Sequence, residues 1–183
     1  MLLTHQELTL RTACAADAPR LTAWWNDGAV MAHAGFPLGL GTTEQKTLTL
    51  LRQNRTGVRE QLIAECSGRP IGELHYRAIL AAEGTAPLPP TAEIGIKLCE
   101  ADSRDKGYGK LLLSLLIREL FRMGFAAIVL DTNPDNTRAR QVYHRLGFVQ
   151  AGLRLNSWRN QLGQLQSTVY YRLEPEQFRD FTL

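Results

Sequence analysis

The sequence contains few cysteines, and their arrangement is not that of a metal site. Among its 183 residues are three cysteines, Cys14, Cys66 and Cys99, which lie far apart and are odd in number. No C-x-x-C pair and no cluster of Cys and His with the spacing of zinc ligands accompanies them. This pattern excludes a disulfide framework, and we expect a reducing compartment and no structural metal.

Long hydrophobic runs are also absent. The N-terminal stretch MLLTHQELTLRTA is interrupted by His5, Gln6 and Glu7, which is not the pattern of a signal peptide. No stretch approaches the ~20 apolar residues that a membrane-spanning helix needs. We therefore expect a cytoplasmic protein without a membrane partner.

The excess of charge of one sign is small. The chain has 21 Lys and Arg residues and 18 Asp and Glu residues, a formal net charge of +3 at pH 7. This charge is compatible with an anionic ligand but gives no argument for a nucleic-acid partner. Hydrophobic residues make up 44% of the chain, and its length predicts a single domain over residues 1–183.

Hydrophobic periodicity and turn residues predict an α/β fold. Asp17 and Asn136 are candidate helix N-caps, and residues 42–45 have the form of a capping box. A long helix is expected over residues 107–123, ended by Gly124. Strands are expected over residues 7–12, 61–66, 71–80, 91–98, 126–131, 148–157 and 168–173.

Two segments have the composition of loops. Residues 26–41 contain four glycines and predict a loop or an irregular helix, and residues 81–90 predict a flexible loop. The resulting order of elements is β-α-α-β-β-β-α-β-α-β-β. It implies a mixed sheet with helices on both faces.

A glycine-containing loop between a predicted strand and the long helix is the strongest local signal. Residues 104–110 read Arg-Asp-Lys-Gly-Tyr-Gly-Lys. Glycines let a backbone approach a ligand, and a helix N-terminus offers unpaired N–H groups and the positive end of a dipole. Such a loop suits a pyrophosphate, although its spacing is neither that of a Walker A loop nor that of a dinucleotide fingerprint. The alternative is an ordinary turn with solvated charges.

A second pattern follows further along the chain. Asn136, Ala139 and Tyr143 stand at fixed spacing before Leu-Gly-Phe. The two patterns together resemble the GNAT acetyltransferase superfamily, in which R/Q-x-x-G-x-G/A follows the fourth strand and N-x-x-A-x-x-x-Y-x-x-x-G-F comes later. The resemblance implies a mostly antiparallel sheet of about seven strands whose fourth and fifth strands splay apart. Residues 21–27 resemble the branch with ribosomal-protein N-terminal and aminoglycoside acetyltransferases.

The resemblance also implies roles for individual residues. Tyr143 would be the general acid near the sulfur of the leaving CoA. The end of the fourth strand would pair with the pantetheine arm, and one of its N–H groups would stabilise the oxyanion. The strand residues are Lys97, Leu98 and Cys99; the pyrophosphate residues are Arg104, Asp105, Lys106, Gly107, Tyr108, Gly109 and Lys110; and Asn136 would contact the cofactor arm.

Some of these assignments have alternatives. Tyr143 could pack against the sheet without a catalytic role. Asp105 departs from the family pattern, because a carboxylate beside a pyrophosphate is repulsive unless it points away. Trp24 and Trp25 are adjacent, so we expect one to be packed in the core and the other to line an acceptor cleft.

A base is needed because an alkyl ammonium must lose a proton before its nitrogen can attack a thioester. Glu93 is the first candidate, eleven residues before Arg104, a spacing similar to that of the catalytic glutamate in histone-acetylating members of the superfamily. In an alternating strand Glu93 shares a face with Gly95 and Lys97. The alternative is a structural carboxylate paired with Lys97 or a backbone group, and Glu73 is a weaker candidate for the base.

The sequence therefore predicts an N-acetyltransferase that uses acetyl-CoA as co-substrate, needs no metal and acetylates a primary amine. No base is identifiable near Cys99, so we expect direct attack in a ternary complex rather than a covalent intermediate. The amine could belong to a small molecule or a protein N-terminus, and the sequence is compatible with a homodimer. The alternative is a non-catalytic acyl-CoA-binding or sensory module on the same fold.

Overall fold

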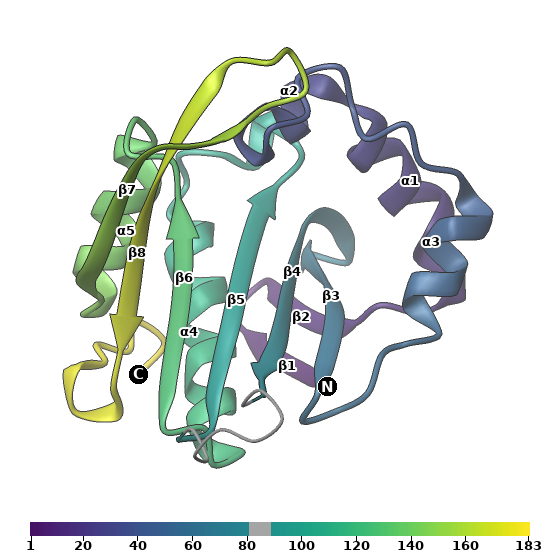
Figure 1. Ribbon diagram of the computed structural model, residues 1–183. Helices are drawn as coiled ribbons and strands as arrows, with labels where there is room; N and C mark the ends of the chain where they lie inside the picture. Colours follow the sequence, from purple (N-terminus) through teal and green to yellow (C-terminus); the bar gives the residue numbers. More distant parts are fainter. Residues whose placement is uncertain (81–88) are drawn as a thin grey trace.

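The computed structural model describes residues 1–80 and 89–183, which contain one eight-stranded sheet (Figure 1). The strand order is β1-β2-β3-β4-β5-β6-β8-β7, and β5 and β6 form its parallel pair. The strands are β1 (Leu2–His5), β2 (Leu8–Thr12), β3 (Arg59–Cys66), β4 (Arg69–Ile79), β5 (Thr91–Leu98), β6 (Ala127–Thr132), β7 (Val149–Arg159) and β8 (Leu165–Leu173). The helices are α1 (Ala18–Asn26), α2 (Gly28–Met31), α3 (Glu44–Leu51), α4 (Tyr108–Arg122) and α5 (Thr137–Leu146).

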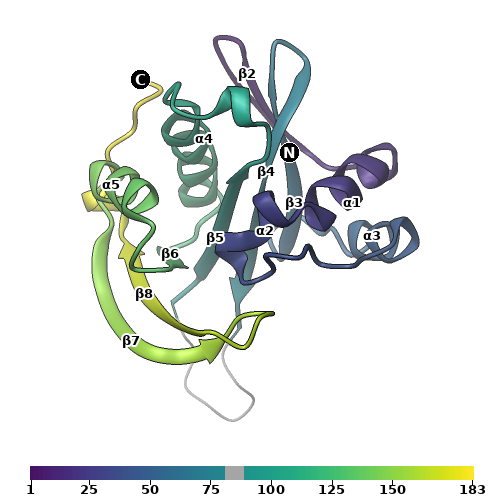
Figure 2. The ribbon, with the colours of Figure 1, turned by 90° about the horizontal axis from the view of Figure 1, so that it is seen from above.

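Helices cover both faces of the sheet, as predicted. Figure 2 shows α4 and α5 on one face and α1, α2 and α3 on the other. Leu62 and Ile63 are neighbours on β3 and are both fully buried, but Leu62 belongs to the core that contains α4 and Ile63 to the core that contains α1 and α3. Successive strand residues point to opposite faces, so one strand supplies both cores.

The parallel pair β5 and β6 is short and then opens. Residues Thr91 to Glu93 pair with Ala127 to Val129, whereas β5 continues to Leu98 and β6 to Thr132. The two arrows diverge in Figure 1. The predicted fold class, with its splayed pair of strands, is confirmed. The pair is fifth and sixth in the chain because an additional strand precedes it.

The predicted boundaries in the second half of the chain are close to the observed ones. Strand β5 has the expected bounds, and Gly124 follows α4. Asn136 caps α5 as predicted, because its Oδ1 accepts a hydrogen bond from the backbone N–H of Ala139. Gly147 ends α5 with a φ of 99°, in the left-handed region that favours glycine.

Several local expectations in the first half were wrong. The additional strand β1 forms a hairpin with β2, so the sheet has eight strands rather than about seven. Asp17 precedes α1, but its carboxylate accepts hydrogen bonds from Arg11 and from the N–H of Cys14 instead of capping the helix. Thr43 alone caps α3, accepting from the N–H of Lys46.

The two expected loops have different outcomes. Residues 26–41 include the short helix α2 and a turn of 3-10 helix, in agreement with an irregular helix. The loop expected over residues 81–90 lies, except for residues 89 and 90, outside the described residues. In the part of the chain that is described, no helix has the length and apolar character needed to cross a membrane.

Candidate active site

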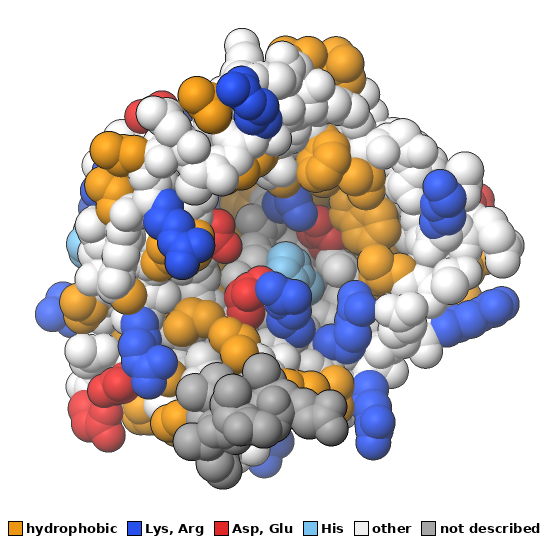
Figure 3. All heavy atoms as spheres, viewed as in Figure 1, with side chains coloured by type: hydrophobic (Ala, Val, Ile, Leu, Met, Phe, Trp, Pro, Cys, Tyr) orange, Lys and Arg blue, Asp and Glu red, His pale blue; other side chains and the backbone are white. Residues whose placement is uncertain are grey.

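Two cavities meet over β4 and β5. The larger, about 760 Å³, lies between β5, β6, the start of α4 and α5. The smaller, about 420 Å³, is lined by β3, β4, β5 and residues of α1 to α3. His75, Glu93 and Lys97 line both cavities. Figure 3 shows a hollow in this face with basic, acidic and histidine side chains gathered around it. The junction is a place where two reactants can come together.

The edge of β5 that faces the larger cavity has no strand partner beyond the three paired residues. The N–H of Cys99 donates to the carbonyl of Ile71, toward β4. Backbone groups alternate in direction along an antiparallel pair, so Lys97 also directs its backbone toward β4, and Ile96 and Leu98 direct theirs toward the cavity. Of the three predicted strand residues, the structure brings the backbone of Leu98 to this edge. It does not bring the backbone of Lys97 or Cys99 there, and sequence reasoning missed Ile96.

The loop 104–110 meets the larger cavity at Arg104 and Gly109 and carries unpaired backbone donors. Helix α4 begins after Gly107, whose φ of 81° suits glycine, and no side chain caps the helix. Among the described residues, the N–H groups of residues 105–109 have no hydrogen-bond acceptor. Gly109, in the first turn, lines the cavity. Unpaired N–H groups at the positive end of a 15-residue helix form a ready anion site.

Arg104 and Asp105 have contacts that the sequence did not indicate. The Arg104 guanidinium donates to the carbonyls of Leu98 (3.0 Å) and Cys99 (3.2 Å), so it fastens the loop to the end of β5. The carboxylate of Asp105 lies 3.3 Å from Nη2 of Arg138 on α5. Asp105 is therefore partly neutralised, and Arg138 is a cation at the cavity that sequence reasoning missed.

The other charged or aromatic side chains of the loop contribute less to the cavity. The Cys66 thiol donates to the Tyr108 hydroxyl (3.6 Å), and Tyr108 packs against the core. The Lys110 ammonium lies 3.8 Å from the centroid of the Phe181 ring. Lys106 is exposed. None of these three side chains lines the larger cavity.

Tyr143 lies on α5, and its side chain lines the larger cavity. The side chain is 7% exposed, and the ring centroid lies 5.8 Å from that of Phe148 and 5.7 Å from that of Tyr171. Among the described residues the hydroxyl has no hydrogen-bond partner, yet it is not sealed from solvent. Burial raises the pKa of the phenol, so at neutral pH the hydroxyl keeps its proton.

Asn136 also lines the larger cavity. Its Oδ1 caps α5, and its Nδ2 donates to the Thr132 hydroxyl (3.3 Å). Both polar atoms therefore hold the connection between β6 and α5, and the predicted contact with a cofactor arm stays a prediction.

Glu93 faces the junction, but Arg77 occupies its carboxylate. The two residues lie opposite each other on β5 and β4, and the guanidinium donates to both carboxylate oxygens (3.0 and 2.8 Å). The alternative of a structural carboxylate named Lys97 or a backbone group as the partner; the partner is Arg77, and Lys97 pairs with Glu73. Asp131, on β6, also lines the larger cavity; burial and then the charge of Glu93 raise the pKa of its carboxyl.

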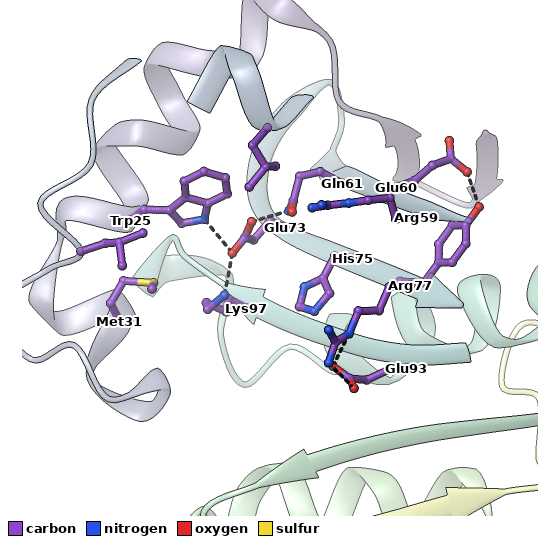
Figure 4. A pocket seen from close by; sticks show the side chains of 13 residues that line it. Trp25, Met31, Arg59, Glu60, Gln61, Glu73, His75, Arg77, Glu93 and Lys97 are labelled. Carbon is purple, nitrogen blue, oxygen red and sulfur yellow. Dashed lines mark hydrogen bonds and ion pairs between the residues drawn. The ribbon is translucent and has the colours of Figure 1, made fainter. Parts of the chain in front are cut away.

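Glu73 is buried at the centre of a network from four elements (Figure 4). Its Oε1 accepts from Trp25 of α1 (2.9 Å) and Lys97 of β5 (2.7 Å), and its Oε2 accepts from Gln61 of β3. The residue is 2% exposed. Both oxygens accept hydrogen bonds and the residue is buried, so Glu73 is placed to orient its neighbours.

Trp24 and Trp25 are both buried, with 6% and 7% exposure. The expectation that only one would pack in the core was wrong, because α1 lies over a second core and each indole N–H finds a carboxylate. Trp24 donates to Glu100 and Trp25 to Glu73. Trp25 also lines the smaller cavity, as expected for one of the pair.

His75 is the residue at the junction that sequence reasoning left aside. Its ring packs against Gly95, where a Cβ atom would lie 2.3 Å from Cε1. Among the described residues the ring nitrogens have no hydrogen-bond partner, and neither is sealed from solvent. Burial lowers the pKa of His75. The register of β4 and β5, which sets His75 opposite Gly95, is the signal that could have found this site.

The cysteines do not form a reactive group here. Cys14 is exposed, Cys66 half-buried and Cys99 buried, and burial raises the pKa of the Cys99 thiol. A thiol with a raised pKa is a poor nucleophile at neutral pH. Within residues 1–80 and 89–183, no group of three or more His, Cys, Asp or Glu side chains is arranged to hold a metal ion.

Comparison with known sequences gives one family. The family model for the acetyltransferase (GNAT) domain matches residues 7–149. A comparison with curated proteins finds no match.

Solved structures with the same fold include three acetyltransferases. RimL, a ribosomal-protein alpha-N-acetyltransferase in complex with coenzyme A, is 18% identical, with 95% of this chain and 98% of that chain covered and a TM-score of 0.78. Spermidine N-acetyltransferase from Vibrio cholerae, in complex with CoA and spermine, is 17% identical, with 93% and 97% covered and a TM-score of 0.78. Ribosomal-protein-alanine N-acetyltransferase from Brucella melitensis is 23% identical, with 90% and 98% covered and a TM-score of 0.74.

Proposed function

The chain belongs to the GNAT acetyltransferase family, and from this premise we propose that it transfers an acetyl group from acetyl-CoA to a primary amine by direct attack in a ternary complex. The observation that carries the proposal is the larger cavity, which an unpaired strand edge and Tyr143 line and which the unpaired N–H groups at the start of α4 adjoin at Gly109. Two proteins of the same fold, solved with CoA and with CoA and spermine, support it.

The residues of the larger cavity fit CoA part by part. The N–H groups of residues 105–109 suit its pyrophosphate, and Arg138, whose charge Asp105 balances, lies at the same cavity. The N–H groups of Ile96 and Leu98 and the carbonyl of Ile96 suit the amides of the pantetheine arm, whereas the carbonyl of Leu98 accepts from Arg104. This arrangement leaves the junction near His75 for the thioester, which acetyl-CoA supplies when bound.

We assign His75 to accept the proton of the acceptor ammonium. Its lowered pKa keeps the ring neutral at neutral pH, and its nitrogens have no partner among the described residues. Glu93, the base predicted from spacing, directs both oxygens to Arg77. The role of Glu93 as the base stays a prediction, and variants of His75 and Glu93 can distinguish the two assignments.

Two further groups act on the reacting atoms. A backbone N–H at the edge of β5, from Ile96 or Leu98, stabilises negative charge on the carbonyl oxygen while the amine nitrogen bonds to the acetyl carbon. The Tyr143 hydroxyl gives its proton to the sulfur as the carbon–sulfur bond breaks. The nitrogen loses its second proton after the attack, and through solvent this proton restores the Tyr143 hydroxyl. The products are the acetylated amine and CoA as a thiol, and the cycle closes when His75 gives the first proton to water.

His75→Gln is expected to lower kcat/KM at neutral pH about tenfold, below the general-base contribution of about 10²–10⁴, because water in the open cavity can replace part of the role. The pKa of His75 is lowered, so the wild-type kcat/KM falls only below the usual histidine value of about 6.5, where the ring binds a proton. His75→Gln should lose this acidic limb. A profile that keeps the limb in His75→Gln and loses it in Glu93→Gln would assign the proton to Glu93.

Amine-dependent release of CoA tests the proposed function. Purified protein is incubated with acetyl-CoA and a panel of primary amines, the thiol is measured, and mass spectrometry locates the acetyl group. We expect release that depends on the amine and an acetyl group on its nitrogen. Binding of acetyl-CoA without transfer to any amine would instead support the non-catalytic acyl-CoA-binding module.

A further inference from the structure

The smaller cavity has chemically different ends. Figure 4 shows Trp25 and Met31 at one end and Arg59 and Arg77 toward the other. Four apolar side chains line it: Trp25, Met31, Leu40 and Leu50. Its volume of about 420 Å³ lies in the lower part of the range of about 300–1,000 Å³ for small-molecule sites. A small molecule with an apolar part and a polar part matches such a cavity.

Each carboxylate of the smaller cavity has its own cation. Two of these carboxylates are buried, since Glu60 is 3% and Glu73 2% exposed. Their oxygens accept further hydrogen bonds from neutral donors. No carboxylate of the described lining is left to hold a second ammonium group of a ligand. The ion pairs are Glu60 with the N-terminal ammonium (3.6 Å), Glu73 with Lys97 (2.7 Å) and Glu93 with Arg77 (2.8 Å).

Arg59 is the cation of this lining that has no carboxylate partner within the described part of the chain. Its Nη1 donates to the amide oxygen of Gln53 (2.9 Å), and the residue is half-buried. A guanidinium has five N–H donors in a planar fork, so most of them stay available for a ligand. A half-buried guanidinium of this kind matches the two oxygens of a carboxylate.

We infer that the acceptor is a small amino-acid-like amine, with its carboxylate at Arg59, its apolar body against Trp25 and Met31, and its amine at the junction near His75. The inference rests on the proposed function and names its substrate class. Polyamines fit poorly, since their additional ammonium groups would meet Arg59 with no carboxylate to balance them. Lys97 and Arg77 stay paired with Glu73 and Glu93, so Arg59 is the cation of this lining that is left for a carboxylate.

The test compares amines that differ in one group. L-Leucine and L-leucinamide share the amine and the apolar body, and only leucine has a carboxylate; spermidine represents the polyamines. We expect kcat/KM for leucine to exceed that for leucinamide at least tenfold, the order of a charge-assisted hydrogen bond. In Arg59→Gln this ratio should fall about tenfold. Arg52→Gln is the matched control. Arg52 is exposed at the C-terminal end of α3 and does not line the cavity, so the variant loses the same charge and should keep the wild-type ratio.

The outcomes separate the inference from the proposed function. Release of CoA with equal kcat/KM for leucine and leucinamide, or with spermidine as the best acceptor, overturns the inference and leaves the acetyltransferase in place. A peptide N-terminus that exceeds leucine overturns it as well. If no amine releases CoA, the proposed function fails together with the inference.

Discussion

Tyr143→Phe is expected to lower kcat about 10²-fold while the melting temperature and the Kd for acetyl-CoA stay near the wild-type values. The phenylalanine ring keeps the contacts with Phe148 and Tyr171, which pack around the side chain. The hydroxyl has no partner among the described residues, so its removal leaves no buried polar group without a bond. A group needed only when the sulfur leaves affects the transition state and not ground-state binding.

Tyr171→Phe is the matched control for this prediction. Its hydroxyl accepts a hydrogen bond from Arg140 (3.0 Å) and does not line the described cavities. The control loses a hydroxyl near the same cluster of rings and should keep kcat. If Tyr143→Phe retains kcat within a factor of about two while chemistry limits the rate, then Tyr143 is a packing residue.

Gly109→Glu is expected to abolish the rise in melting temperature that CoA gives the wild-type protein. At a concentration 100 times the Kd, a ligand stabilises its protein by about 2.7 kcal/mol. For a domain of this size that is a shift of several degrees. A carboxylate in the first turn of α4 would stand where the pyrophosphate is proposed to bind, and would repel it. A negative charge is favourable at a helix N-terminus, so the variant should fold.

Gly109 allows a cleaner test than Gly107. Gly107 has a positive φ, so any side chain there adds backbone strain, whereas a Cβ at Gly109 meets Leu98 and Ile96 only at 3.8 and 3.9 Å. Gly109→Ala is the matched control and should keep the response to CoA. An equal shift in folded Gly109→Glu and in Gly109→Ala would contradict the assignment of the loop to the pyrophosphate.

The elements that sequence predicts well are those set by local chemistry. Gly107, Gly124 and Gly147 all have positive φ, and each bounds a helix where it was expected. The apolar strand at residues 91–98 and the Asn136 cap depend on neighbours within a few positions. The family motif then gave the fold, including the splayed strands.

The site depended on contacts between distant parts of the chain. Lys110 was expected at the phosphate, but its ammonium makes a cation–π contact with Phe181, which is 71 positions away in the C-terminal segment. Glu73 gains its partners from α1, β3 and β5, and no local pattern connects these elements. His75 can place its ring at the junction because Gly95 on the next strand has no side chain there. Only the register of the sheet reveals these pairs.

Hydrogen exchange with and without CoA tests most directly the central claim that the acyl donor binds between β5 and β6. The N–H groups of residues 105–109 have no acceptor among the described residues and should exchange fast in the absence of the ligand. We predict that CoA slows exchange at these residues and at the β5 edge, Ile96 and Leu98, and leaves α3 unchanged. Unchanged exchange at residues 105–109 at a saturating concentration of CoA would contradict the account.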